Sequence, residues 1–122
     1  MTTAKTQKQL DYEKGHKGEG LAVWLLRLKG YQILKRRYKM KVGEADIVAR
    51  KGGTVVFAEV KARPTVAEGL EAITASQRKR ILNAARYFMV RNRAVAGLDY
   101  RFDVIVVTPG LRIHHLEDAW RA

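Results

Sequence analysis

Two adjacent glycines, Gly52 and Gly53, separate two β-prone segments, and this pattern constrains the fold more than any other in the chain. The segments span residues 44–50 and 54–62. Paired glycines between such segments indicate a tight β-hairpin. If the glycines form the loop, Lys51 pairs with Thr54, and Asp46 lies directly opposite Glu59. The sequence therefore predicts both a hairpin and its register.

The rest of the chain supplies the remaining elements of an α/β domain. Periodicity and capping signals predict a helix over residues 12–29, a strand over 31–40, a helix that opens with a Thr74–Gln77 capping box and ends near Arg91, and strands at 104–107 and 111–116. The crossover helix should place the strand after it parallel to the strand before it. We expect a three-layer α/β/α fold with a mixed five-stranded sheet in the order αβββαββ. Residues 1–11 are expected to form a flexible basic tail and residues 12–122 a single domain.

The charge balance indicates the class of partner. The 122 residues carry 24 Lys and Arg against 12 Asp and Glu, a formal net charge of +12. Such a field favours a polyanion, with nucleic acid first and an acidic membrane surface or ribosomal RNA as alternatives. An ordinary solvated surface does not explain a two-to-one excess. The absence of cysteine excludes disulfides and thiolate metal sites. With no signal peptide and no membrane span in the sequence, we expect a cytoplasmic protein.

The predicted hairpin brings two acids together. Asp46 and Glu59 would have Cβ atoms about 5 Å apart, which is unfavourable for like charges unless something compensates. Mg²⁺ or Mn²⁺ would compensate, because hard cations prefer oxygen ligands. Lys61 falls on the same face, two residues after Glu59. A structural ion pair with Lys61 is the alternative, but it would use one acid and leave the second unexplained.

Glu19 is a further candidate for this site. Its neighbours at i+3, i+4 and i+7 are Ala22, Val23 and Leu26, so it projects from an apolar stripe of the first helix. A glutamate in this position either caps the N-terminal region of the helix or reaches into the site. We also expect Trp24, on the same helix, to lie in the core.

The residues around this site resemble a known family. Segments 43–49 and 56–63 are similar to the GEIDLVA and FVEVKxR signatures of the YraN-type family, and Gly18-Glu19 resembles its opening helix. Beyond that family lies the PD-(D/E)XK nuclease superfamily, which includes archaeal Holliday-junction resolvases and restriction endonucleases. The resemblance implies a restriction-endonuclease-like fold. It implies that Asp46, Glu59 and the Val60 carbonyl bind metal, that Glu19 reaches the metal through water, and that Lys61 orients water and stabilises charge on the phosphate.

Basic residues around this site are candidates for contacts with the nucleic-acid backbone. They are Lys35, Arg36, Arg37, Lys39 and Lys41, then Arg63, and then Arg78, Lys79 and Arg80 with the polar Gln77. Each cluster can equally be a solvated surface. Tyr31 and Tyr38 could stack on bases or serve in packing.

Three functional classes remain open from the sequence. The first is a metal-dependent endonuclease acting on DNA, with branched or damaged DNA as a candidate substrate. The second is a nucleic-acid-binding module without turnover. The third is a ribosome-associated basic protein, which explains the charge but not the acids. Cleavage of both strands of a two-fold symmetric substrate would favour a homodimer.

Overall fold

The computed structural model describes the backbone of residues 7–121 and the side chains of residues 18–121. Its elements are α1 (Gln7–Leu28), β1 (Gln32–Lys39), β2 (Glu44–Lys51), β3 (Thr54–Ala62), α2 (Val66–Glu71), α3 (Ala75–Arg91), a 3₁₀ turn (Arg93–Val95), β4 (Asp99–Thr108) and β5 (Arg112–Trp120). The predicted order is confirmed, with the short α2 added. Helix α1 begins at Gln7, so part of the expected tail is helical, and residues 1–6 lie outside the described range. None of the described helices is long and apolar enough to cross a membrane.

A five-stranded mixed sheet in the order β1-β2-β3-β4-β5 forms the centre of the molecule. Strands β2 and β3 pair in the predicted register, from Lys51 opposite Thr54 to Ile47 opposite Ala58. Strand β4 runs parallel to β3, as the crossover predicted. Strands β1 and β5 complete the edges with antiparallel pairing. Both the hairpin register and the mixed sheet are therefore confirmed.

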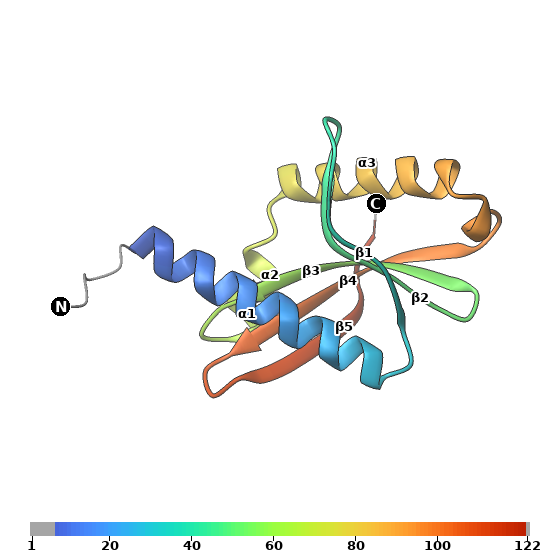
Figure 1. The fold of residues 1–122 in the computed structure, drawn as a ribbon. Helices are drawn as coiled ribbons and strands as arrows, with labels where there is room; N and C mark the ends of the chain where they lie inside the picture. Colours follow the sequence, from blue (N-terminus) through green and yellow to red (C-terminus); the bar gives the residue numbers. More distant parts are fainter. Residues whose placement is uncertain (1–6, 122) are drawn as a thin grey trace.

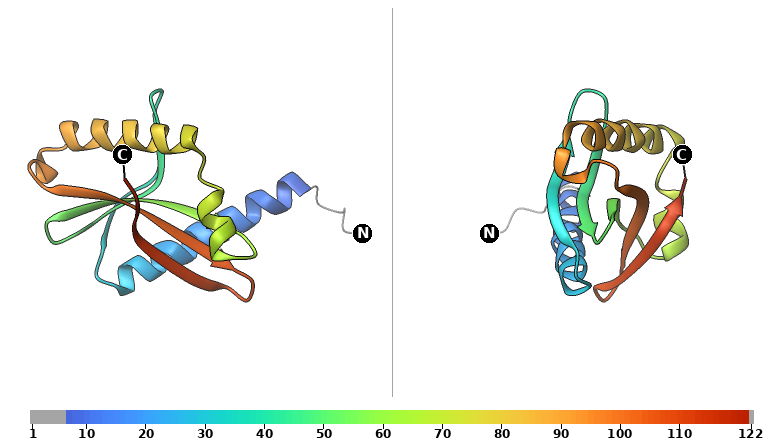
Figure 2. Two further views of the ribbon diagram at one scale, coloured as in Figure 1. Left: turned by 180° about the vertical axis from the view of Figure 1, so that it is seen from behind. Right: turned by 90° about the vertical axis from the view of Figure 1, so that its right-hand side faces the viewer.

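Helices cover both faces of this sheet (Figures 1 and 2). Helix α1 packs on one face, where Ala22 and Leu26 meet Ile47, Val56 and other buried strand residues. Helices α2 and α3 cover the opposite face. There a larger core gathers the α3 residues Ile81, Ala85 and Phe88 with the strand residues Val48, Val55, Phe57, Phe102, Val104 and Val106. The α/β layering that we expected is present.

Helix α3 begins as its sequence indicated. The Thr74 hydroxyl accepts a hydrogen bond from the Gln77 amide at 3.1 Å, and the Gln77 side chain accepts one from the Thr74 amide at 3.3 Å. This reciprocal capping box satisfies two amides that the first helical turn leaves free. The helix then buries Ile81, Ala84, Ala85 and Phe88 on the sheet.

The packing of α1 corrects one expectation. Trp24 is 57% exposed and Leu28 65% exposed, while Ala22 and Leu26 are fully buried. The helix carries two apolar stripes, and the one with smaller side chains faces the sheet. A Cβ atom on Gly18 would lie 3.5 Å from Val60 Cγ1, so the helix approaches the strands closely there. Small residues permit this approach, and Trp24 is left on the outer side.

Gly43, in the β1–β2 turn, lies in close contact with the backbone of α3. A Cβ atom on Gly43 would lie 1.9 Å from the Arg80 carbonyl oxygen, which no other residue could tolerate without a backbone shift. The Asn83 side-chain amide donates to the Val42 carbonyl at 3.0 Å in the same contact. This contact fixes the turn that precedes Asp46.

Candidate functional site: a buried acid pair at the end of a hairpin

The two acids predicted to face each other do meet, at the open end of the β2–β3 hairpin. The backbone pairing of β2 with β3 ends at Ile47 and Ala58. Beyond this pair, acid side chains accept hydrogen bonds from the backbone of the opposite strand. The Asp46 amide donates to Glu59 Oε1 at 3.3 Å, and the Val60 amide donates to Asp46 Oδ2 at 2.8 Å. Each acid thus lies against the backbone of the opposite strand. The residue whose carbonyl was expected to bind metal, Val60, donates its amide to Asp46 in this arrangement.

Glu59 is the more perturbed of the two acids. It is 8% exposed. Burial, with the nearby Asp46 carboxylate as the next cause, raises the pKa of Glu59 to about 9, although Lys61 opposes the shift. Burial and the neighbouring carboxylate therefore favour the protonated form of Glu59 when no cation is bound. Such strongly shifted carboxyl groups concentrate at functional sites.

Lys61 lies beside the acid pair without neutralising it through a direct contact. It is half-buried, two residues beyond Glu59 on β3. Among the described residues, no ion pair within 4.0 Å joins Lys61 to Glu59 or Asp46. The structural ion pair considered as an alternative is therefore absent, and the two carboxyl groups still face each other.

Glu19 reaches the same region from α1. It is 8% exposed, and its carboxylate forms ion pairs with Arg36 Nε at 3.4 Å and Arg37 Nε at 3.0 Å. Burial raises the pKa of Glu19, Arg36 opposes that shift, and the nearby Asp46 adds to it. Its buried Oε1 atom has no hydrogen-bond partner among the side chains and backbone described. Glu19 lies well inside α1, so it does not cap the helix.

The oxygen ligands gathered here fit a small divalent cation in chemistry. The fit rests on the raised pKa of the buried Glu59 and on Glu19 Oε1, which forms an ion pair with Arg36 but accepts no hydrogen bond. Carboxylate oxygens are the ligands that Mg²⁺ and Mn²⁺ prefer. Among the side chains described, those of residues 18–121, however, no group of three or more His, Asp or Glu is arranged as a metal centre. Binding would require Glu59 to lose its proton and Glu19 to turn toward the pair.

The predicted backbone-contacting residues fall on two surfaces. Lys35, Arg36, Arg37 and Lys39 are exposed on β1, Lys41 follows in the turn, and Arg63 is exposed just after β3. On α3, Arg80 lies 3.9 Å from Glu44 of β2, and Lys79 is exposed. Arg78 lies over the Trp120 ring at 5.7 Å. Gln77 lies at the start of α3, where its Oε1 atom accepts the capping-box hydrogen bond from the Thr74 amide.

Both tyrosines that could have stacked on bases serve in packing instead. Tyr38 packs edge-on against Phe88, with ring centroids 5.5 Å apart. Tyr31 is 6% exposed, and its hydroxyl accepts a hydrogen bond from Arg101 at 2.6 Å. Neither ring is free for a base.

Sequence reasoning missed a buried polar network centred on Asp103. The carboxylate of Asp103 is fully buried; it accepts two hydrogen bonds from Arg101, one from the Asp118 amide at 2.9 Å and one from His115 Nε2 at 2.6 Å. Lys29 Nζ lies 2.6 Å from His115 Nδ1. Because an ammonium group only donates, Nδ1 accepts and Nε2 carries the proton that His115 donates to Asp103.

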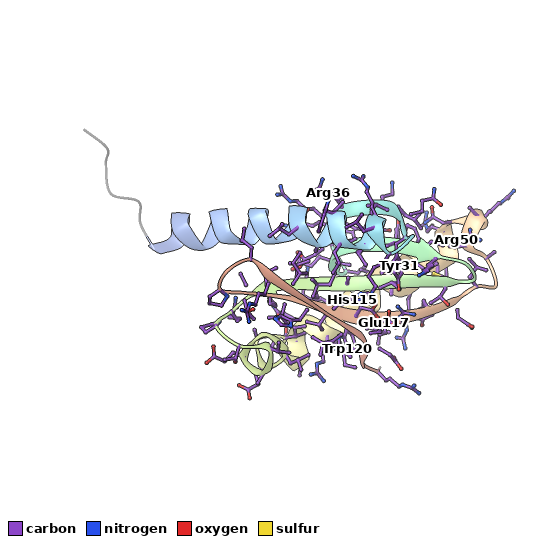
Figure 3. All side chains as sticks on the ribbon, turned by 90° about the horizontal axis from the view of Figure 1, so that it is seen from below. Tyr31, Arg36, Arg50, His115, Glu117 and Trp120 are labelled. Carbon is purple, nitrogen blue, oxygen red and sulfur yellow. The ribbon has the colours of Figure 1, made fainter. Side chains whose placement is uncertain are left out.

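Glu117 lies 3.6 Å from Arg101, and Figure 3 shows Tyr31, His115 and Glu117 close together. The network joins the end of α1 to β4 and β5, and its Asp103 pairs with Ala58, the residue before Glu59. One signal for it was present in the sequence: Asp103 directly precedes the apolar run 104–107. A carboxylate in such a strand must be buried with partners.

Comparison with known proteins places this geometry in a family. Residues 18–107 match the uncharacterised protein family UPF0102. A UPF0102 protein of Chelativorans sp. is 43% identical over 98% of this chain and 96% of its own length. A UPF0102 protein of Parvibaculum lavamentivorans is 44% identical over 90% of this chain and 83% of its own. The matched segment includes Glu19, Asp46, Glu59 and Lys61. The family resemblance predicted from the sequence is thereby confirmed: this chain belongs to the UPF0102, or YraN-like, family.

Proposed function

We propose that this protein is a divalent-metal-dependent nuclease, of the PD-(D/E)XK kind, that hydrolyses phosphodiester bonds in DNA. The observation that carries the proposal is the Asp46–Glu59 pair, in which burial beside the half-buried Asp46 raises the pKa of Glu59 to about 9. Such a pair is unfavourable in a fold held together by apolar packing alone. Its cost is explained if the pair is built to hold a cation. The net charge of +12 supports a polyanionic substrate.

Each residue has a role in this proposal. Asp46 and Glu59 hold the metal, with the Val60 carbonyl as a further ligand and Glu19 acting through water. The metal, when bound, polarises the phosphate and lowers the pKa of its water. Lys61 orients the attacking water and stabilises charge that develops on the phosphate oxygens. Basic residues of β1 and the α3 start hold the strand by its phosphates.

One observation favours the second class, a binding module without turnover. Glu19 is held by Arg36 and Arg37, and the described residues form no three-acid metal cluster. The ion pairs neutralise part of the site without a metal. In a pure binder, loss of a carboxylate near the phosphate would leave affinity unchanged or raise it, because a repulsive charge is removed.

The test is cleavage of labelled linear, flapped and four-way DNA with Mg²⁺, Mn²⁺ or chelator. Glu59→Gln keeps the size and neutral hydrogen bonding of the protonated acid, and Lys61→Met keeps the length of the stem. Glu71→Gln, an exposed acid on α2, is the matched control. We expect metal-dependent cutting by the wild type and the control, reduced at least about 100-fold in the two site variants. Salt-sensitive binding by all four proteins without cutting would establish the binding module instead.

A further inference from the structure

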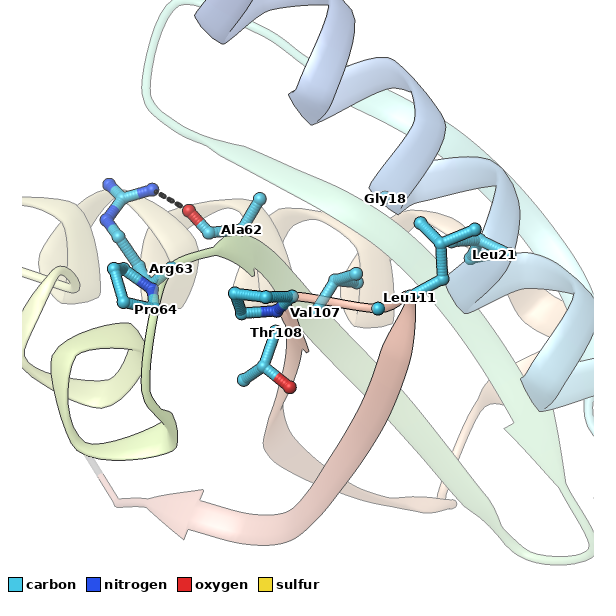
Figure 4. Close-up of a pocket in the computed structure, with 10 residues that line it drawn as sticks. Gly18, Leu21, Ala62, Arg63, Pro64, Val107, Thr108 and Leu111 are labelled. Atoms are coloured by element: carbon cyan, nitrogen blue, oxygen red, sulfur yellow. Dashed lines mark hydrogen bonds between the residues drawn. The ribbon is translucent and has the colours of Figure 1, made fainter.

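A cavity of about 400 Å³ lies between α1, the end of β3 and the β4–β5 turn (Figure 4). Its walls are almost entirely aliphatic. The cavity is lined by, among others, Leu21 from α1, Ala62 and Pro64 after the acid site, and Pro109 and Leu111 from the turn. Apolar pockets of this size hold small organic ligand groups. The cavity is therefore large enough for one such group.

This cavity adjoins the candidate site through two chain segments. Gly18, which lines it, directly precedes Glu19, and Ala62 and Arg63 directly follow Lys61. Two residues of extended strand span about 7 Å, so the cavity mouth lies within about a nucleotide of Lys61. Arg63 is exposed at this mouth, and its guanidinium also donates to the Ala62 carbonyl at 2.8 Å. A cationic residue thus lines the aliphatic cavity two residues after Lys61.

Leu111, on the rim of the cavity, has two unfavourable properties at once. Its φ angle is +57°, in the left-handed region that asparagine and glycine adopt more easily. Its side chain is also 65% exposed. The backbone conformation costs about 1 kcal/mol for leucine, and the tight turn at residues 109–111 between β4 and β5 imposes it. The exposed side chain of Leu111 is therefore accessible on the rim of the cavity.

We infer that the cavity receives an unpaired nucleobase from the strand whose phosphate lies at the acid pair. The inference rests on the proposed function for the position of that strand. A base held between aliphatic side chains gains the apolar contacts that flipped-out bases find in protein pockets. The exposed Arg63 is placed to bind the phosphate of the same nucleotide. The net charge of +12 favours a nucleotide over an uncharged ligand.

The substrate class follows from the geometry. A base stacked and paired within a duplex cannot enter a pocket until it is extruded, which costs a few kcal/mol. A nucleotide in a flap, a gap or a strand end is unpaired already. The protein should therefore prefer DNA that carries unpaired nucleotides next to a duplex over a fully paired linear duplex.

A single abasic residue moved along the unpaired arm of a flapped DNA tests this inference. Binding is measured by fluorescence anisotropy in chelator, for the wild type, Leu111→Asn and Leu28→Asn. Asparagine suits the left-handed turn, so the first variant should fold at least as well while it loses the aliphatic rim. Leu28 has the same 65% exposure but lies on α1 outside the cavity. It provides the matched control.

We expect one position in the arm at which the abasic residue weakens binding about fivefold for the wild type and Leu28→Asn. Leu111→Asn should show less than a twofold effect there. The inference is overturned if no position is sensitive, if Leu111→Asn keeps the full effect, or if no DNA binds. Cleavage in Mg²⁺ separates the two proposals. Cutting without a sensitive position defeats only the base pocket, whereas a sensitive position without cutting supports the pocket and removes the nuclease.

Discussion

The amide of Asp46 donates to the Glu59 carboxyl group at 3.3 Å, while Asp46 itself accepts from the amide of Val60 at 2.8 Å. Each acid thus stands where the next backbone pair of the hairpin would otherwise form. These hydrogen bonds to the sheet backbone fix the positions of the two carboxyl groups without neutralising their charge.

Glu59→Gln should change the pH dependence of stability in the metal-free protein. Burial raises the pKa of Glu59 to about 9 in the folded state, against 4.5 for a solvent-exposed glutamate. Between these values the folded state binds more protons than the unfolded state, so stability falls as pH rises, by up to about 1.4 kcal/mol per pH unit. Glutamine removes this slope. Urea unfolding in chelator from pH 5 to 9 measures it; parallel pH profiles for the two proteins would contradict the buried proton.

Divalent metal should stabilise the wild type more at pH 9 than at pH 6, because Glu59 must release its proton before it can bind metal. At 100 times the dissociation constant the gain is about 2.7 kcal/mol. Thermal unfolding with and without Mn²⁺ measures the effect, and Asp46→Asn should abolish it. Glu71→Gln, exposed on α2, serves as the control. Equal stabilisation of the Asp46→Asn protein would place the metal elsewhere.

Asp103→Ala should destabilise the fold by about 3 to 5 kcal/mol, because it leaves the partly buried Arg101 and the buried His115 side chain without their acceptor. The exposed Arg121–Asp118 ion pair supplies the comparison, and Arg121→Ala should cost less than about 1 kcal/mol. Denaturant unfolding of both variants at pH 7 tests the difference. Similar losses would mean that the network contributes little.

The Asp103 carboxylate should also determine how the free energy of unfolding falls at acid pH. Burial alone would raise the pKa of Asp103, but hydrogen bonds from His115, Arg101 and the Asp118 amide outweigh it and lower the value below 3.8. The stabilisation is therefore complete above pH 3.8 and is lost as pH falls through the lower folded value. Asp103→Asn should unfold with a flatter acid limb, which circular dichroism during acid titration would follow.

Gly43→Ala should destabilise the protein by more than about 2 kcal/mol, since the added Cβ atom would overlap the Arg80 carbonyl oxygen. Gly20→Ala offers a matched change on α1, where a Cβ atom meets nothing within 4 Å. That variant should gain about 0.5 to 1 kcal/mol from helix propensity. Thermal unfolding of the pair tests the close approach, and equal midpoints would show that the turn can move away from α3.

The two faces of α1 should respond differently to substitution. Trp24→Arg should change stability by less than about 0.5 kcal/mol, because the side chain is 57% exposed. Leu26→Ala should cost about 2 to 5 kcal/mol, because Leu26 is fully buried. If Trp24→Arg proves equally costly in denaturant unfolding, a partner covers that face in solution.

Local sequence signals determined the hairpin, its register and the start of α3. Gly52 and Gly53 permit the tight turn, and alternation along the strands then places Asp46 opposite Glu59. The Thr74–Gln77 capping box likewise involves neighbours only four positions apart at most. These features could be predicted because their physical causes lie within a few residues of one another.

The tertiary structure decided what depends on distant segments. Two apolar stripes on α1 were equally compatible with the sequence, and only the close approach at Gly18 selects the small one and exposes Trp24. The Asp103 network and the cavity beside Lys61 join segments far apart along the chain. The sequence predicted that the two acids meet; burial, a property of the whole packed domain, decides that the protonated form of Glu59 is favoured.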